Sequence, residues 1–509
     1  MPSSPMPAPG LCRSPSGSGW SSNPIGRSCN QITEGEEAMG TTLLEHIDTL
    51  ATFDDERTRL HDAWILVRDQ SIAAIGSHAS ELPPADRRID LTGYVVLPGL
   101  INTHHHLFQC LLRNLPPLQD VTLFPWLYTM YRLMSEVRDE DYYIASKINH
   151  AELLLSGCTT NVDHSYLKVN DMQFDSQIRA AEEIGIRFHL ARGSFSIGQS
   201  KGGLPPDHIV EDEDDILADT ERLIQKYHDP HPLAMVRIDN APCSPFSVSE
   251  RLMRESIAMA RRYGVGSHTH LAECPEDHEY MMKTYGKRSV YVADSWGWTG
   301  PDVWYAHAVV LDEGEMDVVA RTGTGVAHCP NSNAYTAAGI CPVTPLLKKG
   351  ATVGLGVDGS AANNSSNMLA EVRSALMLQR VKYGGKALSA AQALELAITG
   401  GARLLRRDDI GAIAPGKAAD LIGVDTRKLG MAGGFFDPVA GLVFCDANHV
   451  DLSMVNGRIR VQDGELVGLD LPALVREHNQ HAADLIDRTE KRYHVDLTSQ
   501  VHRRAYPYQ

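Results

Sequence analysis

The chain has 509 residues and carries 64 acidic against 47 basic side chains, a formal net charge of −17. It contains no Lys/Arg-rich stripe able to follow a phosphate backbone, so the charge balance disfavours nucleic-acid binding. No apolar run approaches the roughly 18 residues that a membrane helix needs, and the nine cysteines are scattered without a CxxC pair. These features predict a soluble protein without a membrane partner, in a reducing compartment, the cytoplasm.

The first 38 residues are rich in Ser, Pro and Gly and show no apolar periodicity. Such a segment buries too little apolar surface to offset its ordering entropy, so we expect residues 1–38 to be a disordered extension. Arg13 and Arg27 in this acid-poor stretch are compatible with an organelle transit peptide. A natural start of the folded part at Met39 favours a dispensable extension instead.

Short strand-like runs occupy residues 39–97, and related runs return in residues 408–470. Examples are Trp64 to Val67 in the first piece and Ala419 to Val424 in the second. Two β-rich pieces at opposite ends of the chain predict one small β-sandwich domain built from both termini. Residues 471–509 are expected to form a C-terminal helical tail.

Between these pieces, residues 98–407 alternate apolar runs with amphipathic helices. Apolar residues share one face of Glu213 to Tyr227, and Ser247 and Glu250 have the spacing of a capping box ahead of Leu252 to Tyr263. Eight strands that alternate with helices predict a parallel (β/α)8 TIM barrel. The eight strand-like runs are residues 97–103, 158–163, 187–192, 235–241, 264–271, 303–310, 325–328 and 352–358.

Polar side chains stand at the ends of five of these eight runs. The first run leads into His104 and His106, and their i, i+2 spacing on an extended backbone directs both imidazoles to one point while His105 faces away. A bare HxH occurs in surface loops about as often as in metal sites, and a single buried histidine is usually structural. Five polar ends at one rim of a barrel are hard to obtain by chance, so we interpret them as a site. The other ends carry His270, His307, His328 and Asp358.

These donors predict a metal centre. Imidazole and carboxylate suit a borderline divalent ion, foremost Zn²⁺, although Fe²⁺ accepts the same set. We expect one divalent metal with a position left open for water, which would make it catalytic. The expected ligands are His104, His106, His270 and Asp358.

The motifs around these residues resemble those of the amidohydrolase superfamily, in the branch of aminohydrolases that act on purine, pterin and triazine rings. The resemblance extends from about residue 41 to residue 470 and rests, in chain order, on PGLINTHHH, HTHLAE, AHCPNSN, GLGVDGSAANNSSN and GAIAPGKAADL. Residues 163–166, 241–249 and 323–330 look most like 8-oxoguanine deaminases. Hydroxyatrazine hydrolases and isoxanthopterin deaminases share parts of the same pattern.

The resemblance implies a hydrolytic deaminase in which a metal-activated water attacks a ring carbon that bears an amino group. The metal would lower the pKa of its water from about 15.7 toward about 7. Asp358 would be the general base, His307 would hold the hydroxide in line, and Glu273 would protonate a ring nitrogen and later the departing amine. Barrel hydrolases with two metals commonly bridge them with a lysine from strand four, and residues 235–241 contain none, so we expect a single metal.

The implied substrate is a small heterocycle, foremost 8-oxoguanine, which would yield urate and ammonia. Gln109 is placed like the family's substrate-binding glutamine, whose amide both donates to and accepts from a purine edge. His328 is expected to hydrogen-bond Asp358 or a substrate carbonyl, with a purely structural role as the alternative. Candidates for stacking on the ring are Trp126, Tyr166 and Phe246, although lone aromatic residues more often serve packing.

Two departures from the family pattern leave the exact ring open. Guanine deaminases carry an arginine just before the phenylalanine matched by Phe246, where this chain has Cys243-Ser244-Pro245, and this argues against guanine. Many 8-oxoguanine deaminases have Met-Arg-Leu where this chain continues with Ala334-Tyr335-Thr336.

A hydroxyatrazine-type triazine aminohydrolase and an isoxanthopterin deaminase are therefore the alternatives. A metal-free scaffold is the non-enzyme alternative, but it predicts missing ligands and none is missing. The long helices expected over residues 367–383 and 390–405 are candidates for a homo-oligomer interface.

Overall fold

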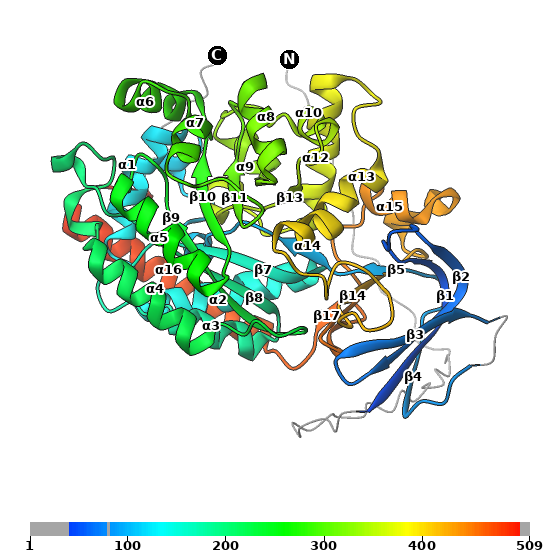
Figure 1. Ribbon diagram of the computed structural model, residues 1–509. Coiled ribbons are helices and arrows are strands. Elements are labelled where there is room, and N and C mark those ends of the chain that lie inside the picture. Colours follow the sequence, from blue (N-terminus) through cyan, green and yellow to red (C-terminus); the bar gives the residue numbers. More distant parts are fainter. Residues whose placement is uncertain (1–39, 79–81, 499–509) are drawn as a thin grey trace, which may run out of the picture. The chain divides into compact units, whose positions relative to one another are not determined.

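A closed barrel of eight parallel strands forms the centre of the computed structural model, with helices around it (Figure 1). The structure describes residues 40–78 and 82–498, so the extension predicted for residues 1–38 and the end of the predicted tail lie outside the described residues. Around the barrel the strands follow the order β10-β11-β12-β13-β6-β7-β8-β9. The predicted (β/α)8 barrel is confirmed. Its strands are β6 (Leu100–Asn102), β7 (Cys158–Ser165), β8 (Arg187–Ser194), β9 (Val236–Pro242), β10 (Ser267–Leu271), β11 (Val303–His307), β12 (Gly325–His328) and β13 (Val353–Leu355).

The barrel strands are buried along their whole length, as the eight buried residues of β7 and of β8 show, except that the first two residues of β9 are half-buried. Strands covered on both faces carry continuous apolar runs, which is why the sequence shows them so clearly. The strands β6 and β13 have only three residues each. Beyond their ends, the amide of Asp358 still donates to the carbonyl of His104. The carboxyl ends of these two strands therefore place Asp358 directly beside His104.

Several helices begin directly after a residue whose side chain caps them. The predicted helix Glu213–Tyr227 is present as α4, and the Asp212 carboxylate before it accepts the amide of Asp214. The other α-helices are α1 (Leu123–Met134), α2 (Asp139–Leu155), α3 (Asp175–Ile184), α5 (Glu250–Tyr263), α6 (Pro275–Tyr285), α7 (Ser289–Ser295), α8 (Glu313–Thr322), α9 (Pro330–Tyr335), α10 (Val343–Lys348), α11 (Ser360–Asn363), α12 (Met368–Tyr383), α13 (Ala390–Glu395), α14 (Gly401–Leu404), α15 (Pro438–Phe444) and α16 (Leu471–Tyr493).

Short helical turns complete the connections. The π-helical turn η5 (Leu396–Gly400) joins α13 to α14, so the helix expected over residues 390–405 is one continuous helical stretch. The 3-10 turns are η1 (Leu107–Leu112), η2 (Pro116–Leu118), η3 (Gln199–Lys201), η4 (Asp207–Ile209), η6 (Leu429–Met431) and η7 (Gly434–Phe436).

One predicted cap is wrong. The hydroxyl of Ser249, not that of Ser247, accepts the amide of Leu252 at 3.0 Å and caps α5. Because α5 begins at Glu250, the capping residue is the one directly before it. Ser247 instead donates its hydroxyl to the carbonyl of Ser244.

Strands from both ends of the chain form a second, mostly antiparallel sheet, which confirms the predicted small β-domain. We call it the terminal sheet; its nine strands run in the order β17-β16-β15-β14-β5-β1-β2-β3, with β4 paired to β1. The strands are β1 (Thr41–Ala51), β2 (Arg59–Arg68), β3 (Ser71–Ser77), β4 (Arg87–Asp90), β5 (Tyr94–Pro98), β14 (Leu421–Asp425), β15 (Leu452–Val455), β16 (Arg458–Gln462) and β17 (Glu465–Leu466).

The terminal sheet and the barrel are joined at a single residue, Gly99, which lies between β5 and β6. A Cβ atom at this position would lie 2.0 Å from the hydroxyl oxygen of Thr159, so only glycine fits. On the sheet side, Leu97 of β5 pairs with Ile422 of β14. The first barrel strand is therefore fixed in place by a strand from the other end of the chain.

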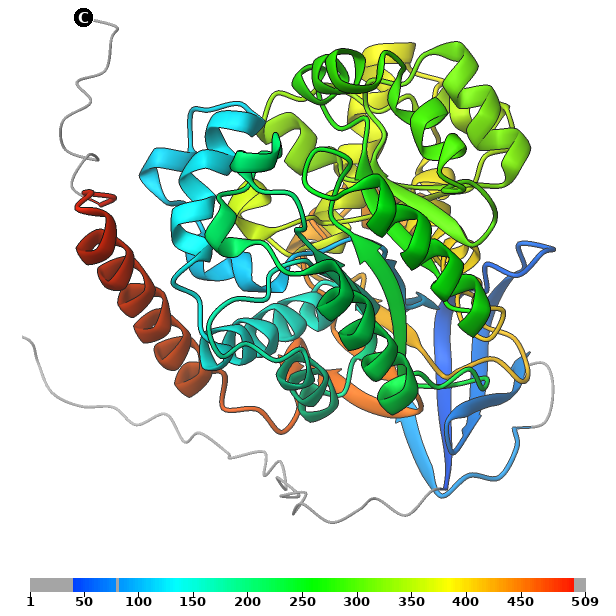
Figure 2. The same cartoon turned by 60° about the vertical axis from the view of Figure 1, so that its left-hand side comes forward.

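The helix α16 runs along the outside of the fold and packs against α1, α2 and η1 (Figure 2). His481 of α16 lies 2.7 Å from a carboxylate oxygen of Asp141 in α2. Because η1 directly follows His106, the C-terminal helix supports the segment that leaves the first strand of the barrel.

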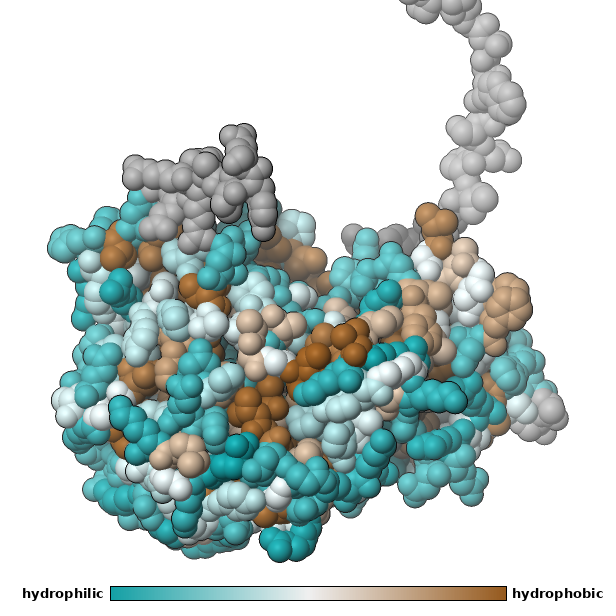
Figure 3. Space-filling model, turned by 90° about the horizontal axis from the view of Figure 1, so that it is seen from above, coloured by the Kyte–Doolittle hydropathy of each residue, from teal (hydrophilic) through white to brown (hydrophobic). Residues whose placement is uncertain are grey.

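The face seen from above Figure 1 carries exposed apolar residues in several separate groups between hydrophilic ones (Figure 3). Within residues 40–78 and 82–498, none of the helices combines the length and apolar character needed to cross a membrane. The seven cysteines of the same residues are all free thiols.

Candidate active site

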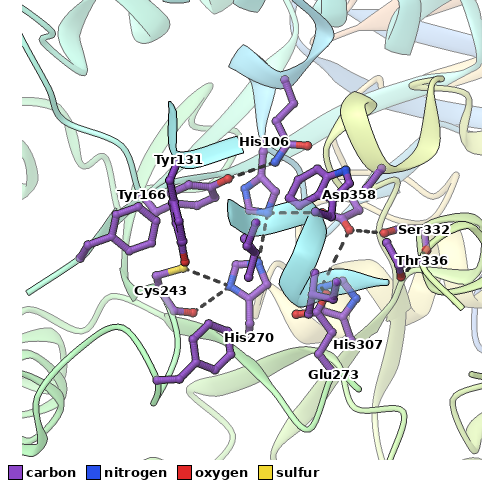
Figure 4. Close-up of a pocket in the computed structure, with 17 residues that line it drawn as sticks. His106, Tyr131, Tyr166, Cys243, His270, Glu273, His307, Ser332, Thr336 and Asp358 are labelled. Atoms are coloured by element: carbon purple, nitrogen blue, oxygen red, sulfur yellow. Dashed lines mark hydrogen bonds and ion pairs between the residues drawn. The ribbon is translucent and has the colours of Figure 1, made fainter. Parts of the chain in front are cut away.

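A cavity opens at the carboxyl ends of the barrel strands, where the polar residues predicted from the sequence gather (Figure 4). Its walls are mostly aromatic and apolar, and its floor carries imidazoles and carboxyl groups. The lining residues are His106, Gln109, Leu123, Trp126, Leu127, Tyr131, Tyr166, Phe195, Cys243, Phe246, His270, Glu273, His307, Ser332, Thr336, Asp358 and Ala362.

The segment after β6 directs alternate imidazoles in opposite directions, as predicted. His104 and His106 approach each other with ring centroids 4.7 Å apart, whereas His105 turns away and contacts the hydroxyl of Ser366 at 3.0 Å. All three rings are buried. Two donors from one short segment are thus available at one point.

The backbone around the cavity is held in uncommon conformations. His307 and Asp358 have φ angles of 72° and 61°, and Ala272, directly before Glu273, has 53°. Each such left-handed residue costs about 1–3 kcal/mol unless its surroundings impose it, and such residues cluster at functional sites. The strain here falls on three of the predicted strand ends.

Hydrogen bonds fix which nitrogen of each imidazole carries the proton. The Nδ1 atom of His106 lies 2.9 Å from the carbonyl oxygen of His164, and that of His270 lies 2.7 Å from the carbonyl oxygen of Cys243. A carbonyl only accepts, so both Nδ1 atoms are protonated and both Nε2 atoms present lone pairs. These two Nε2 atoms face each other at 3.1 Å. Two lone pairs at this distance repel unless a cation lies between them.

A relay of two histidines orients His104 in the same way. The Nδ1 atom of His268 donates to the carbonyl of Trp304 at 2.9 Å, which leaves its Nε2 atom as an acceptor for His104 Nδ1 at 2.7 Å. The Nε2 atom of His104 is consequently a third lone pair, and it has no hydrogen-bond partner among the described residues. His268 had no role in the sequence interpretation, although its i, i+2 spacing from His270 signals a shared face of β10.

The four predicted ligands fit a single divalent ion. The Asp358 Oδ1 atom lies 3.4 Å from His104 Nε2 and 3.3 Å from His106 Nε2. Donors bound tetrahedrally at 2.0–2.1 Å are separated by about 3.3 Å, which agrees with these distances. Burial lowers the pKa of His106 to about 4 and that of His270 to about 3, so these imidazoles are neutral donors at pH 7. The chemistry of the set, neutral nitrogen plus carboxylate, is that of zinc-type sites.

The sequence interpretation gave no role to three further residues at this point, Ser332, Gly359 and His164. The hydroxyl of Ser332 and the amide of Gly359 donate to the two oxygens of Asp358, which favours its carboxylate form. His164 joins His104, His106 and His270 in a cluster whose ring nitrogens all lie within 4.8 Å of one another, but its Nε2 atom donates to the carbonyl of Ala241 at 2.7 Å. All three residues lie within the quoted motifs, which is the only indication of their roles that the sequence offers.

Glu273 and His307 face each other across the floor of the cavity, as Figure 4 shows. The His307 Nε2 atom lies 3.6 Å from Glu273 Oε1 and 3.9 Å from Asp358 Oδ2. Burial raises the pKa of Glu273 well above its usual range, and the charges of Asp358 and Asp277 add to the rise. Burial therefore favours the protonated form of Glu273, whereas it lowers the pKa of His307 to about 4 and keeps that ring neutral.

The predicted substrate-side residues divide into two groups. The Gln109 amide donates to the Tyr166 hydroxyl at 3.0 Å, and its oxygen, buried beside the cavity, has no partner among the described residues. Trp126, Tyr166 and Phe246 line the cavity wall, so the structure brings all of them to the predicted place.

His328 is placed differently. It is fully buried, does not line the cavity, and neither ring nitrogen has a hydrogen-bond partner within the described residues. Its predicted hydrogen bond to Asp358 is wrong, because Ser332 and Gly359 occupy the carboxylate oxygens instead.

The chain is similar in sequence to known proteins over most of its length. The amidohydrolase family model matches residues 95–460. The chain is 45% identical over 425 residues to the 8-oxoguanine deaminase of Pseudomonas aeruginosa, covering 83% of this chain and 94% of that protein. It is 36% identical over 457 residues to the hydroxydechloroatrazine ethylaminohydrolase of Pseudomonas sp. strain ADP, covering 86% of this chain and 94% of that protein. An isoxanthopterin deaminase of an unknown prokaryotic organism is also 36% identical, with 85% and 94% covered.

The fold also resembles solved structures over most of the chain. The atrazine chlorohydrolase of Arthrobacter aurescens TC1 complexed with zinc superposes with a TM-score of 0.83 at 32% identity, covering 87% of this chain and all of that one. An adenosine deaminase from Xanthomonas campestris with bound zinc gives a TM-score of 0.79 at 26% identity, covering 87% and 98%.

Proposed function

The chain belongs to the amidohydrolase family and is a hydrolase acting on C–N bonds, and from this premise we propose that it deaminates an oxidised purine, converting 8-oxoguanine and water to urate and ammonia. The observation that carries the proposal is the convergence of three imidazole lone pairs and one carboxylate beside a protonated carboxyl group, Glu273, at the floor of a buried cavity. This combination is what hydrolysis of an amino-substituted heterocycle requires.

We propose His104, His106, His270 and Asp358 as the ligands of one divalent ion, foremost Zn²⁺, with Fe²⁺ as the alternative. When bound, such an ion lowers the pKa of an adjacent water from about 15.7 toward about 7. The carbonyls of His164 and Cys243 and the ring of His268 keep the three imidazoles in the donor tautomer. These partners therefore hold the site ready before any ion arrives.

The protein's own groups handle the protons. Asp358 is ionised through its hydrogen bonds from Ser332 and Gly359, so it can accept the proton of the attacking water. Glu273 carries a proton and lies on the cavity side, where it can donate to the ring nitrogen next to the amino-bearing carbon. As the new C–O bond forms, the C=N π bond becomes a C–N single bond.

The second half of the reaction returns the protons. The proton taken up by Asp358 passes to the amino group, the C–N bond to that group breaks, and ammonia leaves. The carbon keeps the oxygen as a carbonyl, because the proton of its hydroxyl group passes to Glu273 and restores the protonated carboxyl group. With Glu273 only 6% exposed and Asp358 only 5% exposed, bulk water does not compete for these steps.

The cavity favours a flat, uncharged ring. Trp126, Tyr166 and Phe246 offer aromatic faces, the free oxygen of Gln109 accepts a hydrogen bond, and the lining residues include no lysine or arginine. A ring bearing phosphate or carboxylate would meet no cationic side chain there. Among flat rings, 8-oxoguanine is favoured because the 45% identical relative bears that name, whereas the hydroxyatrazine and isoxanthopterin relatives are 36% identical.

The test is ammonia release by purified, zinc-loaded protein given 8-oxoguanine, with metal-stripped and zinc-restored samples as controls. Guanine, hydroxyatrazine and isoxanthopterin, assayed at equal concentration, compare the alternative rings. We expect turnover on 8-oxoguanine that disappears with the metal and returns with it. Turnover on another ring alone would replace the substrate and keep the reaction, whereas metal binding without any ammonia would overturn the proposal.

We further propose that the enzyme works in the cytoplasm, in keeping with the seven free cysteines of the described residues. We also propose α12 and the helical stretch from α13 to α14 as candidates for a homo-oligomer interface. Analytical ultracentrifugation of the full chain would measure it directly.

A further inference from the structure

Asn333 is a fully buried residue of α9 whose side chain reaches a catalytic ring. Its amide nitrogen, Nδ2, lies 2.9 Å from the Nδ1 atom of His307. The backbone of Asn333 is fixed on both sides, because its amide donates to the carbonyl of Cys329 and its carbonyl accepts the amide of Ala338. Asn333 thus holds its side-chain amide nitrogen in a fixed position beside His307 Nδ1.

The opposite nitrogen of His307 decides which tautomer the ring adopts. His307 Nε2 faces two carboxyl oxygens, Glu273 Oε1 at 3.6 Å and Asp358 Oδ2 at 3.9 Å. Because Asp358 is ionised, an N–H group pointing toward its Oδ2 atom is favourable, whereas a lone pair pointing toward that atom is repelled. With the proton on Nε2, the Nδ1 atom becomes an acceptor and needs a donor, which the amide group of Asn333 supplies.

His307 then carries its ring proton on a different nitrogen from the other three imidazoles, which the sequence motifs do not reveal. His104, His106 and His270 carry their protons on Nδ1 and expose Nε2 lone pairs, whereas His307 exposes an Nε2–H group. The first three are built to bind a cation. His307 is built to donate a hydrogen bond into the cavity.

We propose that Asn333 is a positioning residue that sets the Nε2–H tautomer of His307, so that His307 donates a hydrogen bond to the attacking water and Asp358 alone accepts the proton of that water. The inference rests on the proposed function for its catalytic meaning, while the tautomer itself is a property of the protein. Neighbouring Ser332 donates to Asp358, so one turn of α9 orients both groups.

The tautomer can be read by ¹⁵N NMR of the zinc-loaded protein labelled at histidine. The two ring nitrogens of a neutral imidazole have well-separated shifts according to which one is protonated, and the signals missing from a His307→Gln variant identify those of His307. We expect the proton on Nε2 of His307. A proton on Nδ1 in the unsubstituted protein would overturn the proposal whether or not the protein releases ammonia.

Two variants that keep the branched shape of asparagine separate tautomer control from packing. Asn333→Asp, as a carboxylate, accepts from Nδ1 and forces the wrong tautomer, so we expect kcat to fall by about 100-fold or more with a small change in KM. Asn333→Leu removes the donor but leaves Nε2–H favoured by the Asp358 carboxylate, so its kcat should fall less. A merely structural role predicts the reverse order, because leucine loses every polar contact.

Across the series kcat must follow the tautomer measured in the same samples. Asn331→Leu is the matched control, since Asn331 lies on the same helix but donates to Glu371 at 2.6 Å. It should leave the His307 signals unchanged. A variant with the Nδ1–H tautomer and unreduced kcat would overturn the catalytic part of the proposal. Absence of ammonia release from every sample, including the unsubstituted protein, would instead remove the proposed function and leave the tautomer assignment standing.

Discussion

The two ends of the barrel handle buried polar groups in opposite ways. At the amino ends of the strands, Arg187 donates from Nε and Nη2 to the two oxygens of Asp420 at 2.8 and 3.0 Å, and its remaining donors reach the carbonyls of Leu233 and Ala234 and the side chain of Asn456. Every N–H group of this buried guanidinium is paired. At the carboxyl ends, the Nε2 atoms of the ligand imidazoles face one another as lone pairs.

This difference separates stability from function. A buried charge whose hydrogen-bond partners are all present holds two segments together. Buried lone pairs that point at one another without a donor between them form a binding site for a cation instead. Barrel enzymes generally divide their two ends in this way. Substitutions at one end of the barrel at a time therefore test this difference.

The largest effect is expected from His104→Ala, which removes one of the three lone pairs. The variant should lose stoichiometric zinc, and ammonia release should fall by on the order of 10⁴-fold because the water pKa is no longer lowered. Metal analysis after dialysis and the ammonia assay measure both. A variant that keeps one equivalent of zinc would show that the ligand set is misplaced.

Glu273→Gln should lower kcat by about 10²–10⁴-fold while the zinc content stays at one equivalent, because a neutral amide cannot transfer the proton. The exposed Glu279 lies on α6, which begins two residues after Glu273, and gives the control variant Glu279→Gln, which should turn over normally. Full turnover in Glu273→Gln with bound metal would show that another group moves the proton.

Arg187→Met removes the buried ion pair at the amino ends of the barrel strands. It leaves Asp420 buried without its partner, so the free energy of unfolding should fall by about 3–5 kcal/mol, while kcat of the folded fraction stays unchanged. Urea titration and the ammonia assay, measured on the same sample, provide the two numbers. The double variant Arg187→Met/Asp420→Asn should recover part of the loss. A reduced kcat with unchanged stability would contradict the division between the two ends.

The smallest effect is a pH dependence of stability. Burial raises the pKa of Asp163 and Asp277 to about 7 and that of Glu371 to about 8. Above the ordinary carboxyl pKa, the folded state binds these protons while the unfolded state has lost them, so stability falls as pH rises through 7 to 8. Below pH 6.5 the buried histidines act in the opposite direction, because only the unfolded chain protonates them.

The contribution of one group can be isolated with Glu371→Gln. Since the amide does not titrate, the slope of unfolding free energy against pH between 6.5 and 8.5 should become shallower by up to about 1.4 kcal/mol per pH unit. Urea titrations at four pH values give the slope. An unchanged slope would mean that Glu371 is already ionised at pH 6.5.

The sequence was most informative where one residue type has few uses. Buried strands need continuous apolar runs, so the eight barrel strands could be located, and imidazoles at their carboxyl ends marked His104, His106, His270 and His307. Asp358 and Glu273 followed from the same rim. The fold and the chemical groups of the site were therefore predictable before their distances were known.

The partners of these groups were not predictable, because they depend on register across the barrel. His268 contacts His104 from 164 positions away, and Ser332 reaches Asp358 from the short helix α9. Serine, asparagine and histidine serve many structural roles, so their type alone gives no signal. His328 shows the converse, since a histidine at the correct strand end lies outside the cavity.

The pairing of β5 with β14 also has a consequence for synthesis of the chain. During synthesis, the open edge of β5 at Leu97 is covered only after Ile422 has been made, more than 300 positions later. At translation rates of about 5–20 residues per second this interval lasts on the order of 15–65 s. During that time an apolar strand edge is available to chaperones or to other nascent chains. A polypeptide released before Leu421 would contain all eight barrel strands and would still carry that open edge.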